Sequence, residues 1–332
     1  MSESDTIGPS YSSLWSSSVA PATLIAYNKH LQKFLSYTRL RLSQLLRLSP
    51  SRIDTRFVAF LNHLHRTRSS YSYGSQALYG LIFHCPKLKL QLPGSKRALK
   101  GWDRIRTQTS HPPLTWELTI MIALTFARRG LHAQATASLL AFECYLRVGE
   151  HLRLRYQDVA MPNDPRLGSA HTKMCLRLVR TKTGMNKWAT IRCPVVAAAM
   201  QLYLSSRTFA PDDLIFPFSM YQWRTQLRSV TVDLGLGHIP FVPHSFRHGG
   251  ATRDAMRGLS LEEIRLHGRW KSPISCERYI QSGPAMLMMN SIPAALMNQA
   301  YHFEPQVIAC LRHLHATVPA EHLSQRRRVH FA

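Results

Sequence analysis

The segment "VPHSFRHGGATRD" holds the side chains best suited to chemistry. Pro243 precedes a predicted helix, and His244 and Arg247 lie three residues apart on one face of its first turn. A helix N-terminus offers free N–H groups and partial positive charge, so basic side chains there indicate a phosphate-binding site. Gly249 and Gly250 follow at once, which is unusual in mid-helix. A basic surface turn is the alternative interpretation.

Two short helices follow this segment and carry two further candidates. The first begins with a capping box from Ser260 to Glu263, and the second has Ser272 as its N-cap. Trp270 stands between the two helices, and Tyr279 comes nine residues later, near the end of the second. These elements would present a histidine, an arginine, a tryptophan and a tyrosine in that order along the chain.

This order resembles the C-terminal signature of the phage-integrase family, the tyrosine recombinases. Upstream, "ECYLRVGEHLRLRYQDV" resembles the family's first-arginine segment, with Arg147 as the arginine and Glu150 at its supporting acidic position. "VRTKTGMNK" resembles the β-hairpin that carries the catalytic lysine. Lys182 matches best, and Lys187 beyond the turn is the rival. The resemblance covers about 113–290, and "GRWKSPISCERYI" looks most like recombinases of Crypton- and DIRS-type mobile elements.

The resemblance implies metal-independent cleavage of DNA without a cofactor. A tyrosine attacks the scissile phosphorus, two arginines hold its non-bridging oxygens, a lysine protonates the leaving 5′-oxygen, and histidine and an indole N–H assist. His248 and His267 lie outside this set and are interpreted as structural or DNA-adjacent. The residues implied for catalysis are Arg147, Lys182, His244, Arg247, Trp270 and Tyr279.

Composition agrees with a nucleic-acid partner. The 332 residues include 42 Lys and Arg against 18 Asp and Glu, so the formal net charge is +24. Such a charge favours a polyanion, either DNA or an anionic membrane. The longest apolar run, 118–127, is half a bilayer span, and the Ser-rich start lacks the order of a secretory signal. We therefore expect an intracellular protein, nuclear if the source is eukaryotic, that binds double-stranded DNA and no membrane.

Metal binding and disulfides are not expected. The six cysteines are scattered and contain no CxxC pair, so we interpret them as reduced and mostly buried thiols. His244 and His248 have the i,i+4 spacing of a zinc site. No acidic residue or cysteine lies near them in sequence to complete the ligands.

Periodicity predicts a mainly α-helical chain with a small β-hairpin or sheet, an α+β fold built as a two-domain DNA clamp. We expect a flexible arm at 1–19, a helical core-binding domain at 20–105, a linker at 106–113 and a catalytic domain at 114–290. The remaining tail, 291–332, contains apolar "IPAALM", which either docks in a neighbouring protomer or packs on its own domain. The expected DNA-binding residues are Lys96, Arg97, Lys100, Arg104 and Arg106.

The function most consistent with these residues is site-specific recombination or integration for a mobile element. The enzyme would be weakly associated or monomeric when free and a homo-tetramer on DNA. Two alternatives remain: a type IB topoisomerase, which shares the chemistry, and a domesticated DNA-binding protein that no longer cleaves.

Overall fold

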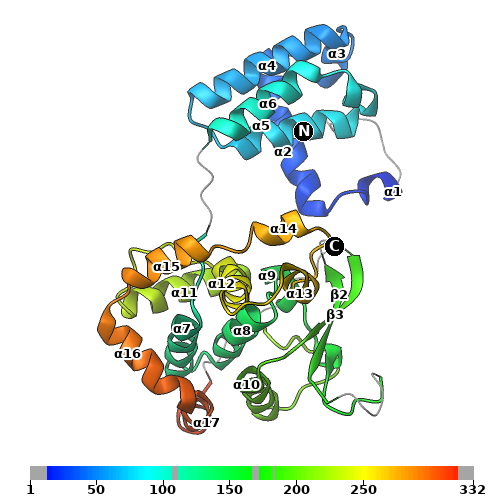
Figure 1. Ribbon diagram of the computed structural model, residues 1–332. Coiled ribbons are helices and arrows are strands. Elements are labelled where there is room, and N and C mark those ends of the chain that lie inside the picture. Colours follow the sequence, from blue (N-terminus) through cyan, green and yellow to red (C-terminus); the bar gives the residue numbers. More distant parts are fainter. Residues whose placement is uncertain (1–12, 107–110, 167–171, 182–183, 321–332) are drawn as a thin grey trace. The chain divides into compact units, whose positions relative to one another are not determined.

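The structure is a computed structural model that describes residues 13–106, 111–166, 172–181 and 184–320 (Figure 1). The chain divides between Thr109 and Ser110 into two compact units, here called unit 1 and unit 2. This division lies inside the range 106–113, where a linker was expected. Helices dominate the described residues, and the strands form one small sheet in unit 2. The predicted mainly helical α+β class is confirmed.

Unit 1 is built of helices, four of which begin at proline: α2, α4, η1 and α6. Pro21 and Pro50 occupy the first turn of the two longest helices, where a missing N–H breaks no hydrogen bond. Helix α2 packs on α5 and α4 packs on α6, around a core that includes Phe34, Phe57 and Leu81. The elements are α1 (Ser13–Ser16), α2 (Pro21–Thr38), α3 (Leu42–Leu45), α4 (Pro50–Arg66), α5 (Tyr71–His84), η1 (Pro86–Leu90) and α6 (Pro93–Ile105).

Two helices of unit 1, α6 and α1, were not predicted individually from the sequence. The basic stretch after residue 92 forms a helix, α6, whose N-terminal N–H groups are capped from α4. The Asp54 carboxylate accepts hydrogen bonds from Gly94 N and Ser95 N, each at 2.7 Å. Within the expected flexible arm, residues 13–16 form α1, and Trp15 lies edge-on to Phe83 with ring centroids 6.2 Å apart.

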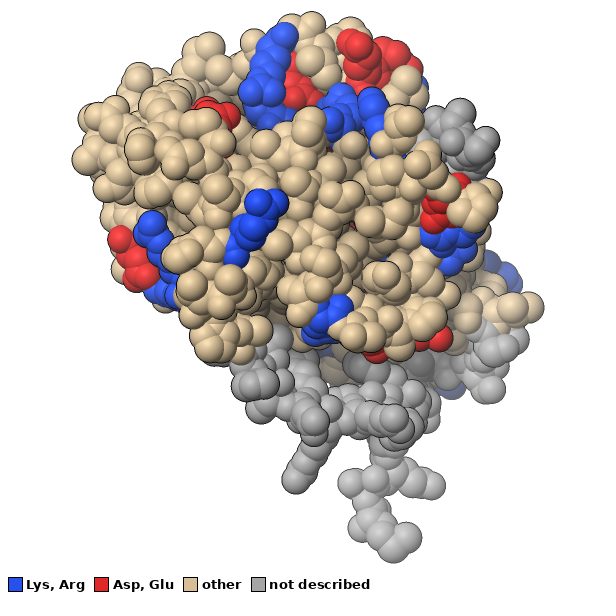
Figure 2. Space-filling view, turned by 90° about the horizontal axis from the view of Figure 1, so that it is seen from below, with Lys and Arg blue, Asp and Glu red and all other residues tan. Residues whose placement is uncertain are grey.

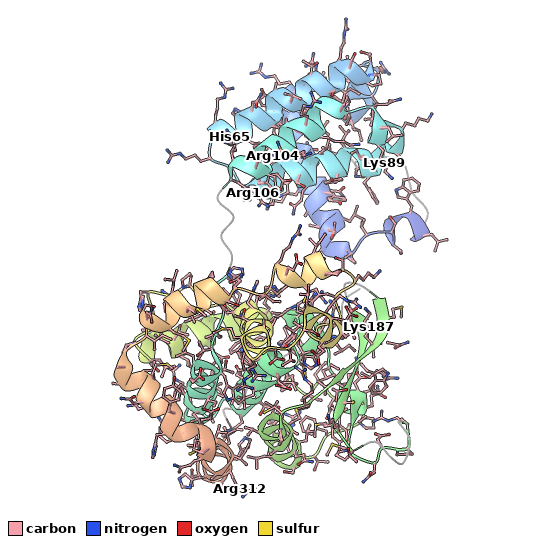
Figure 3. All side chains as sticks on the ribbon, viewed as in Figure 1. His65, Lys89, Arg104, Arg106, Lys187 and Arg312 are labelled. Atoms are coloured by element: carbon pink, nitrogen blue, oxygen red, sulfur yellow. The ribbon has the colours of Figure 1, made fainter. Side chains whose placement is uncertain are left out.

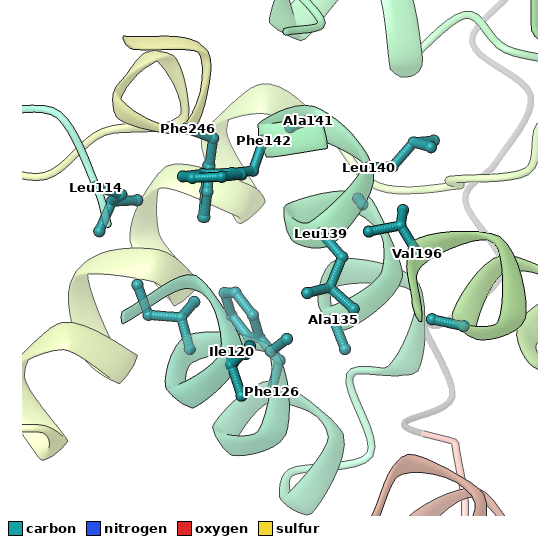
Figure 4. Close-up of a cluster of buried hydrophobic side chains, with 14 of the residues drawn as sticks. Leu114, Ile120, Phe126, Ala135, Leu139, Leu140, Ala141, Phe142, Val196 and Phe246 are labelled. Carbon is teal, nitrogen blue, oxygen red and sulfur yellow. The ribbon is translucent and has the colours of Figure 1, made fainter. Parts of the chain in front are cut away.

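Unit 2 surrounds a larger core in which α7 and α8 are packed together (Figure 4). Helices α10 and α12 pack against α8 and enclose side chains such as Phe142 and Phe246. The helices are α7 (Trp116–Arg128), α8 (His132–Glu143), α9 (Val148–His151), η2 (Tyr156–Asp158), α10 (Pro194–Ser205), α11 (Met220–Asp233), α12 (Pro243–Met256), α13 (Leu261–His267), α14 (Pro273–Glu277), α15 (Ser282–Asn290), α16 (Ala294–Phe303), η3 (Glu304–Gln306) and α17 (Val307–Thr317).

The sheet of unit 2 has the strand order β1-β2-β3 and is antiparallel throughout: β1 (Val159–Ala160), β2 (Cys175–Thr181) and β3 (Gly184–Thr190). Thr181 pairs with Gly184, so the predicted hairpin is present, and only residues 182 and 183 separate its strands. Asn186 lies inside β3 with φ 48°.

Gly249 and Gly250 let α12 approach two main-chain segments very closely. A Cβ atom on Gly249 would stand 2.0 Å from Leu114 O, and one on Gly250 would stand 2.0 Å from Phe142 O. Any side chain at either position would therefore overlap backbone atoms. This close packing explains the two mid-helix glycines, and it places α12 directly against the end of α8.

The C-terminal helices α16 and α17 pack against α7, and α17 also packs against α10. Ile292 and Leu296 are buried in the unit 2 core, together with Val307 and Leu311. The Trp116 indole N–H donates to Glu304 Oε1 at 2.8 Å, which links the first residue of α7 to the first residue of η3, between α16 and α17. Of the two alternatives for "IPAALM", the structure shows the second: the segment packs on its own domain. "SQRRRVHFA" lies outside the described residues.

Figure 2 shows one face, seen from below, on which basic side chains stand singly or in small groups among other residues.

No helix in the described ranges is long and apolar enough to cross a membrane. Within those same ranges, no three His, Cys, Asp or Glu side chains are grouped to hold a metal ion.

Candidate active site

Arg247 lies at the centre of the candidate site and is fully buried. It extends from the first turns of α12 between two chain segments, donating from Nη1 to Tyr145 O and from Nη2 to Gly268 O, the latter at 3.2 Å. Its guanidinium carbon is 4.3 Å from the centroid of the Trp270 ring and 4.8 Å from that of Tyr279. The arginine and the tyrosine that the sequence placed in one set are therefore in direct stacking contact.

Arg147 is the N-cap residue of α9 and is held by Glu150. Its main-chain N and its Nη1 both donate to the Glu150 carboxylate, at 2.9 and 2.8 Å. Burial raises the pKa of Glu150, but Arg269, the N–H of Arg147 and the charges of Arg247 and Arg147 outweigh it, and the pKa lies below its ordinary value. Glu150 is almost wholly buried, whereas the Arg147 side chain remains 18% exposed and accessible to a ligand.

Tyr279 lies just after α14 and is half-buried among three rings. Its ring centroid is 4.9 Å from that of Trp270, 5.4 Å from that of His244 and 4.7 Å from that of His248, which it stacks on at 27°. The main chain here is tied to α12, since Thr252 Oγ1 donates to Tyr279 O at 3.3 Å. The predicted nucleophile is thus positioned by both ring packing and backbone contacts.

His244 and His248 are neutral at pH 7. Burial, followed by the neighbouring charges of His248 and Arg247, lowers the pKa of His244 to about 4. Burial also lowers the pKa of His248 to about 4, against the raising effect of a hydrogen bond with the Tyr279 main chain. A neutral imidazole beside the tyrosine can accept a proton. His111, whose ring centroid is 6.3 Å from that of His244, adds a third histidine.

The site carries more positive than negative charge. Burial, reinforced by Arg147 and Arg269, lowers the pKa of Arg247 to about 9, so it remains protonated at pH 7. The site has three guanidinium groups, those of Arg147, Arg247 and Arg269. Among its described residues, Glu150 alone supplies a carboxylate to balance them. Arg247 Nε, Arg269 Nε and Trp270 Nε1 are buried donors without a hydrogen-bond acceptor among the described atoms. Such an arrangement suits a bound anion with several oxygen acceptors.

The lysine of the predicted set is divided between two positions of the hairpin. Lys182 lies outside the described residues. Lys187 lies on β3 opposite Leu178 (Figure 3), and it therefore shares the sheet face of Leu178 and Ala189, which pack into the core. Helix α9, which follows Arg147, packs against β2. The hairpin is therefore next to the arginine segment, and the choice between the two lysines stays open.

The residues expected to bind DNA in unit 1 lie on or directly after α6, and all five are exposed: Lys96, Arg97, Lys100, Arg104 and Arg106. Figure 3 labels two of them, Arg104 and Arg106. At 100° per residue the first four span an arc of about 100°. The buried Leu99 and Trp102 occupy the other side. Arg106 pairs with Asp103 and covers the Tyr71 ring, so it is the one most engaged within the unit.

Several site residues were not predicted from the sequence. Arg269 is buried against Glu150, and His248 stacks on the tyrosine and meets Gln281 Nε2 at 3.1 Å. Tyr145 is fully buried and donates from its hydroxyl to Asp254. Their only sequence signal is adjacency to predicted residues, because burial depends on packing between distant segments. His267, whose Nε2 meets Glu143 O at 2.7 Å, has the structural position expected for it.

Comparison with known proteins identifies the fold. The sequence matches no protein-family model and no curated protein sequence. The structure is similar to the Tn1549 transposon integrase in complex with transposon right end DNA, with a TM-score of 0.50 and 13% identity, covering 84% of this chain and 98% of that one. It is equally similar to the XerH site-specific recombinase bound to palindromic difH substrate in a post-cleavage complex, with a TM-score of 0.50 and 13% identity over 85% and 78% of the two chains.

The XerA recombinase is a further match, with 17% identity over 88% of this chain and 94% of that one and a TM-score of 0.41. The fold of this chain is that of the tyrosine recombinases and integrases. The resemblance that the sequence suggested is thus confirmed at the level of the fold, whereas its likeness to Crypton- and DIRS-type recombinases stays a prediction.

Proposed function

We propose that this chain is a site-specific DNA recombinase or integrase that cuts and rejoins DNA through a 3′-phosphotyrosine intermediate. The observation that carries the proposal is the packing of the Tyr279 ring against Arg247. His244 and Trp270 also contact this ring. Metal-independent phosphoryl transfer requires a nucleophile, positive charge around the phosphate and a group that accepts a proton. A tyrosine beside several arginines and a neutral histidine meets these requirements. The DNA-bound state of the two similar structures supports DNA as the substrate.

Each step of the reaction has a residue to perform it. Tyr279 Oη attacks the scissile phosphorus and loses its proton to His244, while Arg147 and Arg247 bind the non-bridging oxygens. The indole N–H of Trp270 donates to one of these oxygens. The 5′-oxygen leaves with a proton from the hairpin lysine. A 5′-hydroxyl from another strand then attacks the phosphotyrosine, which releases Tyr279 and rejoins the DNA.

The biological setting belongs to the same proposal. We infer that the enzyme serves a mobile element and acts in the nucleus if its source is eukaryotic. Strand exchange between two duplexes needs four cleavages, so we also infer a homo-tetramer on DNA. The free protein would be monomeric or weakly associated, since "IPAALM" packs within unit 2.

The test is covalent trapping on nicked duplexes, drawn from a random-sequence pool after selection for binding to this protein. Tyr279→Phe should bind these duplexes normally and form no denaturation-resistant adduct, because the nucleophilic oxygen is gone. Tyr221→Phe is the matched control, since Tyr221 is 78% exposed in the same unit. An adduct with Tyr279→Phe would refute the assignment of the nucleophile.

The same experiment separates the alternative functions. A wild-type protein that binds the selected DNA but forms no adduct is a non-cleaving DNA-binding protein. Relaxation of supercoiled plasmid without sequence preference would instead indicate a type IB topoisomerase. The general acid is tested with a substrate in which sulfur replaces the bridging 5′-oxygen. This substrate should restore much of the cleavage lost in Lys182→Ala, because the thiolate leaves without needing a proton. Rescue of Lys187→Ala alone would move the role to Lys187.

A further inference from the structure

Arg269 is a third arginine in the candidate site, and its side chain is almost wholly buried. Nη1 donates to His267 O at 2.8 Å, and Nη2 donates to Cys144 O at 2.9 Å. The same Nη2 is 3.6 Å from Glu150 Oε2. One head group therefore joins the loop before Trp270 to the loop before Arg147, two segments far apart in sequence.

The backbone at this position is unfavourable for a residue with a side chain. Arg269 has a φ of 57°, in the left-handed region that glycine adopts most readily. A glycine stands next to it, but Gly268 has an ordinary φ of −78°. Gly268 is needed where it is because a Cβ there would stand 1.7 Å from the Trp270 ring. The chain thus keeps an arginine where the backbone favours glycine, which points to a role for its head group.

Arg269 shares its acceptors with both predicted phosphate-binding arginines. Tyr145 O accepts from Arg247 Nη1 and lies 3.5 Å from Arg269 Nη2. Glu150 Oε1 accepts from the Arg147 side chain. Glu150 Oε2 accepts from the Arg147 main-chain N and also lies 3.6 Å from Arg269 Nη2. Because Arg269 balances part of the negative charge on Glu150, Glu150 attracts the Arg147 guanidinium less strongly than it would alone.

We propose that Arg269 is a positioning residue that shares the charge of Glu150 and so leaves Arg147 free to bind the scissile phosphate. This inference rests on the proposed function. With Arg269 present, three guanidinium groups face one carboxylate, and the excess of two positive charges matches a dianionic phosphorane better than a singly charged diester. Arg269 therefore favours the transition state through the field and the position of the other arginines.

The test compares Arg269→Met with a control, Arg257→Met, in which an exposed arginine at the C-terminal end of α12 is removed. The substrate is the selected nicked duplex, and the readout is the rate of adduct formation with DNA bound. We expect Arg269→Met to be slower by about 100-fold, since small displacements of reacting groups have effects of that size. Arg257→Met should equal the wild type.

Two further measurements distinguish positioning from a general loss of structure. Adding Glu150→Gln to Arg269→Met should recover part of the rate, because an uncharged amide no longer draws Arg147 away. A duplex with an uncharged methylphosphonate at the scissile position should also shrink the deficit of Arg269→Met. A double variant no faster than Arg269→Met, together with an unchanged deficit on methylphosphonate, would overturn the positioning role.

The failure of this inference differs from failure of the proposed function. If the wild type forms no adduct on selected DNA, the recombinase function is lost, and this role of Arg269 with it. If the wild type forms the adduct and Arg269→Met forms it equally fast, the function stands and the role of Arg269 is refuted.

Discussion

The two units treat positive charge in opposite ways. Unit 1 has 16 Lys and Arg against 4 Asp and Glu, and all 16 basic side chains are exposed. Unit 2 has the remaining 26 against 14 and buries Arg247 and Arg269 completely or nearly so. An exposed cation binds a polyanion in a salt-sensitive way, whereas a buried cation is expensive and acts in one geometry. If the proposed function holds, we expect the charge of unit 1 to provide affinity for DNA and the buried charge of unit 2 to take part in the chemistry.

The sharpest test of this comparison is Arg247→Met. Methionine fills the buried space without the charge, so we expect adduct formation on the selected duplex to slow by about 1,000-fold, the upper range for removal of one oxyanion-stabilising group. DNA affinity should change by less than about tenfold, because most phosphate contacts lie elsewhere. Adduct rate and dissociation constant are both measured. A large loss of affinity with normal cleavage would place Arg247 with the exposed cations.

Acidification should unfold unit 2 before unit 1. Burial is the first cause of the lowered pKa of five histidines in unit 2: His151 to about 3, and His244, His248, His267 and His315 to about 4. Unfolded histidine titrates near 6.5, so below that pH the unfolded state binds more protons and stability falls towards pH 4. Each histidine contributes up to about 1.4 kcal/mol for every pKa unit by which it is lowered, so the loss from the five together should exceed a few kcal/mol.

In unit 1 the pKa is lowered for two histidines, His30 and His84, again chiefly by burial. Hydrogen exchange of the whole protein, followed by peptide at a series of pH values and corrected for intrinsic rates, measures both units at once. Equal loss of protection in the two units between pH 6.5 and 4 would contradict the expected difference.

Removing the basic face of α6 should weaken binding without affecting chemistry. The change is Lys96→Gln, Arg97→Gln, Lys100→Gln and Arg104→Gln together. We expect affinity for the selected duplex to fall by about 10- to 100-fold, and the slope of log affinity against log salt to decrease by about 0.9 for each phosphate that is no longer neutralised. Adduct formation by fully bound DNA should be unchanged. An unaltered salt slope would show that this face does not meet DNA.

The smallest expected effect concerns two arginines with the same backbone conformation. Arg39 ends α2 with φ 56° and is exposed, whereas Arg269 has φ 57° and is buried. Arg39→Gly should raise the free energy of unfolding of unit 1 by about 1 kcal/mol, because glycine adopts this conformation without strain. Arg269→Gly relieves the same strain yet should lose cleavage. Urea denaturation and adduct rates measure the pair, and equal cleavage by both variants would contradict the assigned difference.

The sequence predicted the residues that touch one another but not the network that holds them. Arg247, Trp270 and Tyr279 could be found because their types and spacing are local properties. The burial of Arg269 could not, because it depends on contacts with Cys144 and Glu150, which are far away in the sequence. Helix α6 lies within the range 20–105 that was expected to be helical, but it was not predicted individually. Its charged residues outnumber the apolar positions, such as Leu99 and Trp102, that pack on α4 and α5.

The packing of α16 and α17 on α7 has a consequence for how the chain folds during its synthesis. The core of unit 1 lies between Leu31 and Trp102, so this unit can fold while the ribosome is still making unit 2. Unit 2 must wait for Val307 and Leu311 before the surface of α7 is covered. We expect ribosome-bound chains halted at residue 290 to resist protease in unit 1 and to be cut in unit 2. Through most of translation, therefore, the apolar surface of unit 2 stays uncovered while that of unit 1 is already buried.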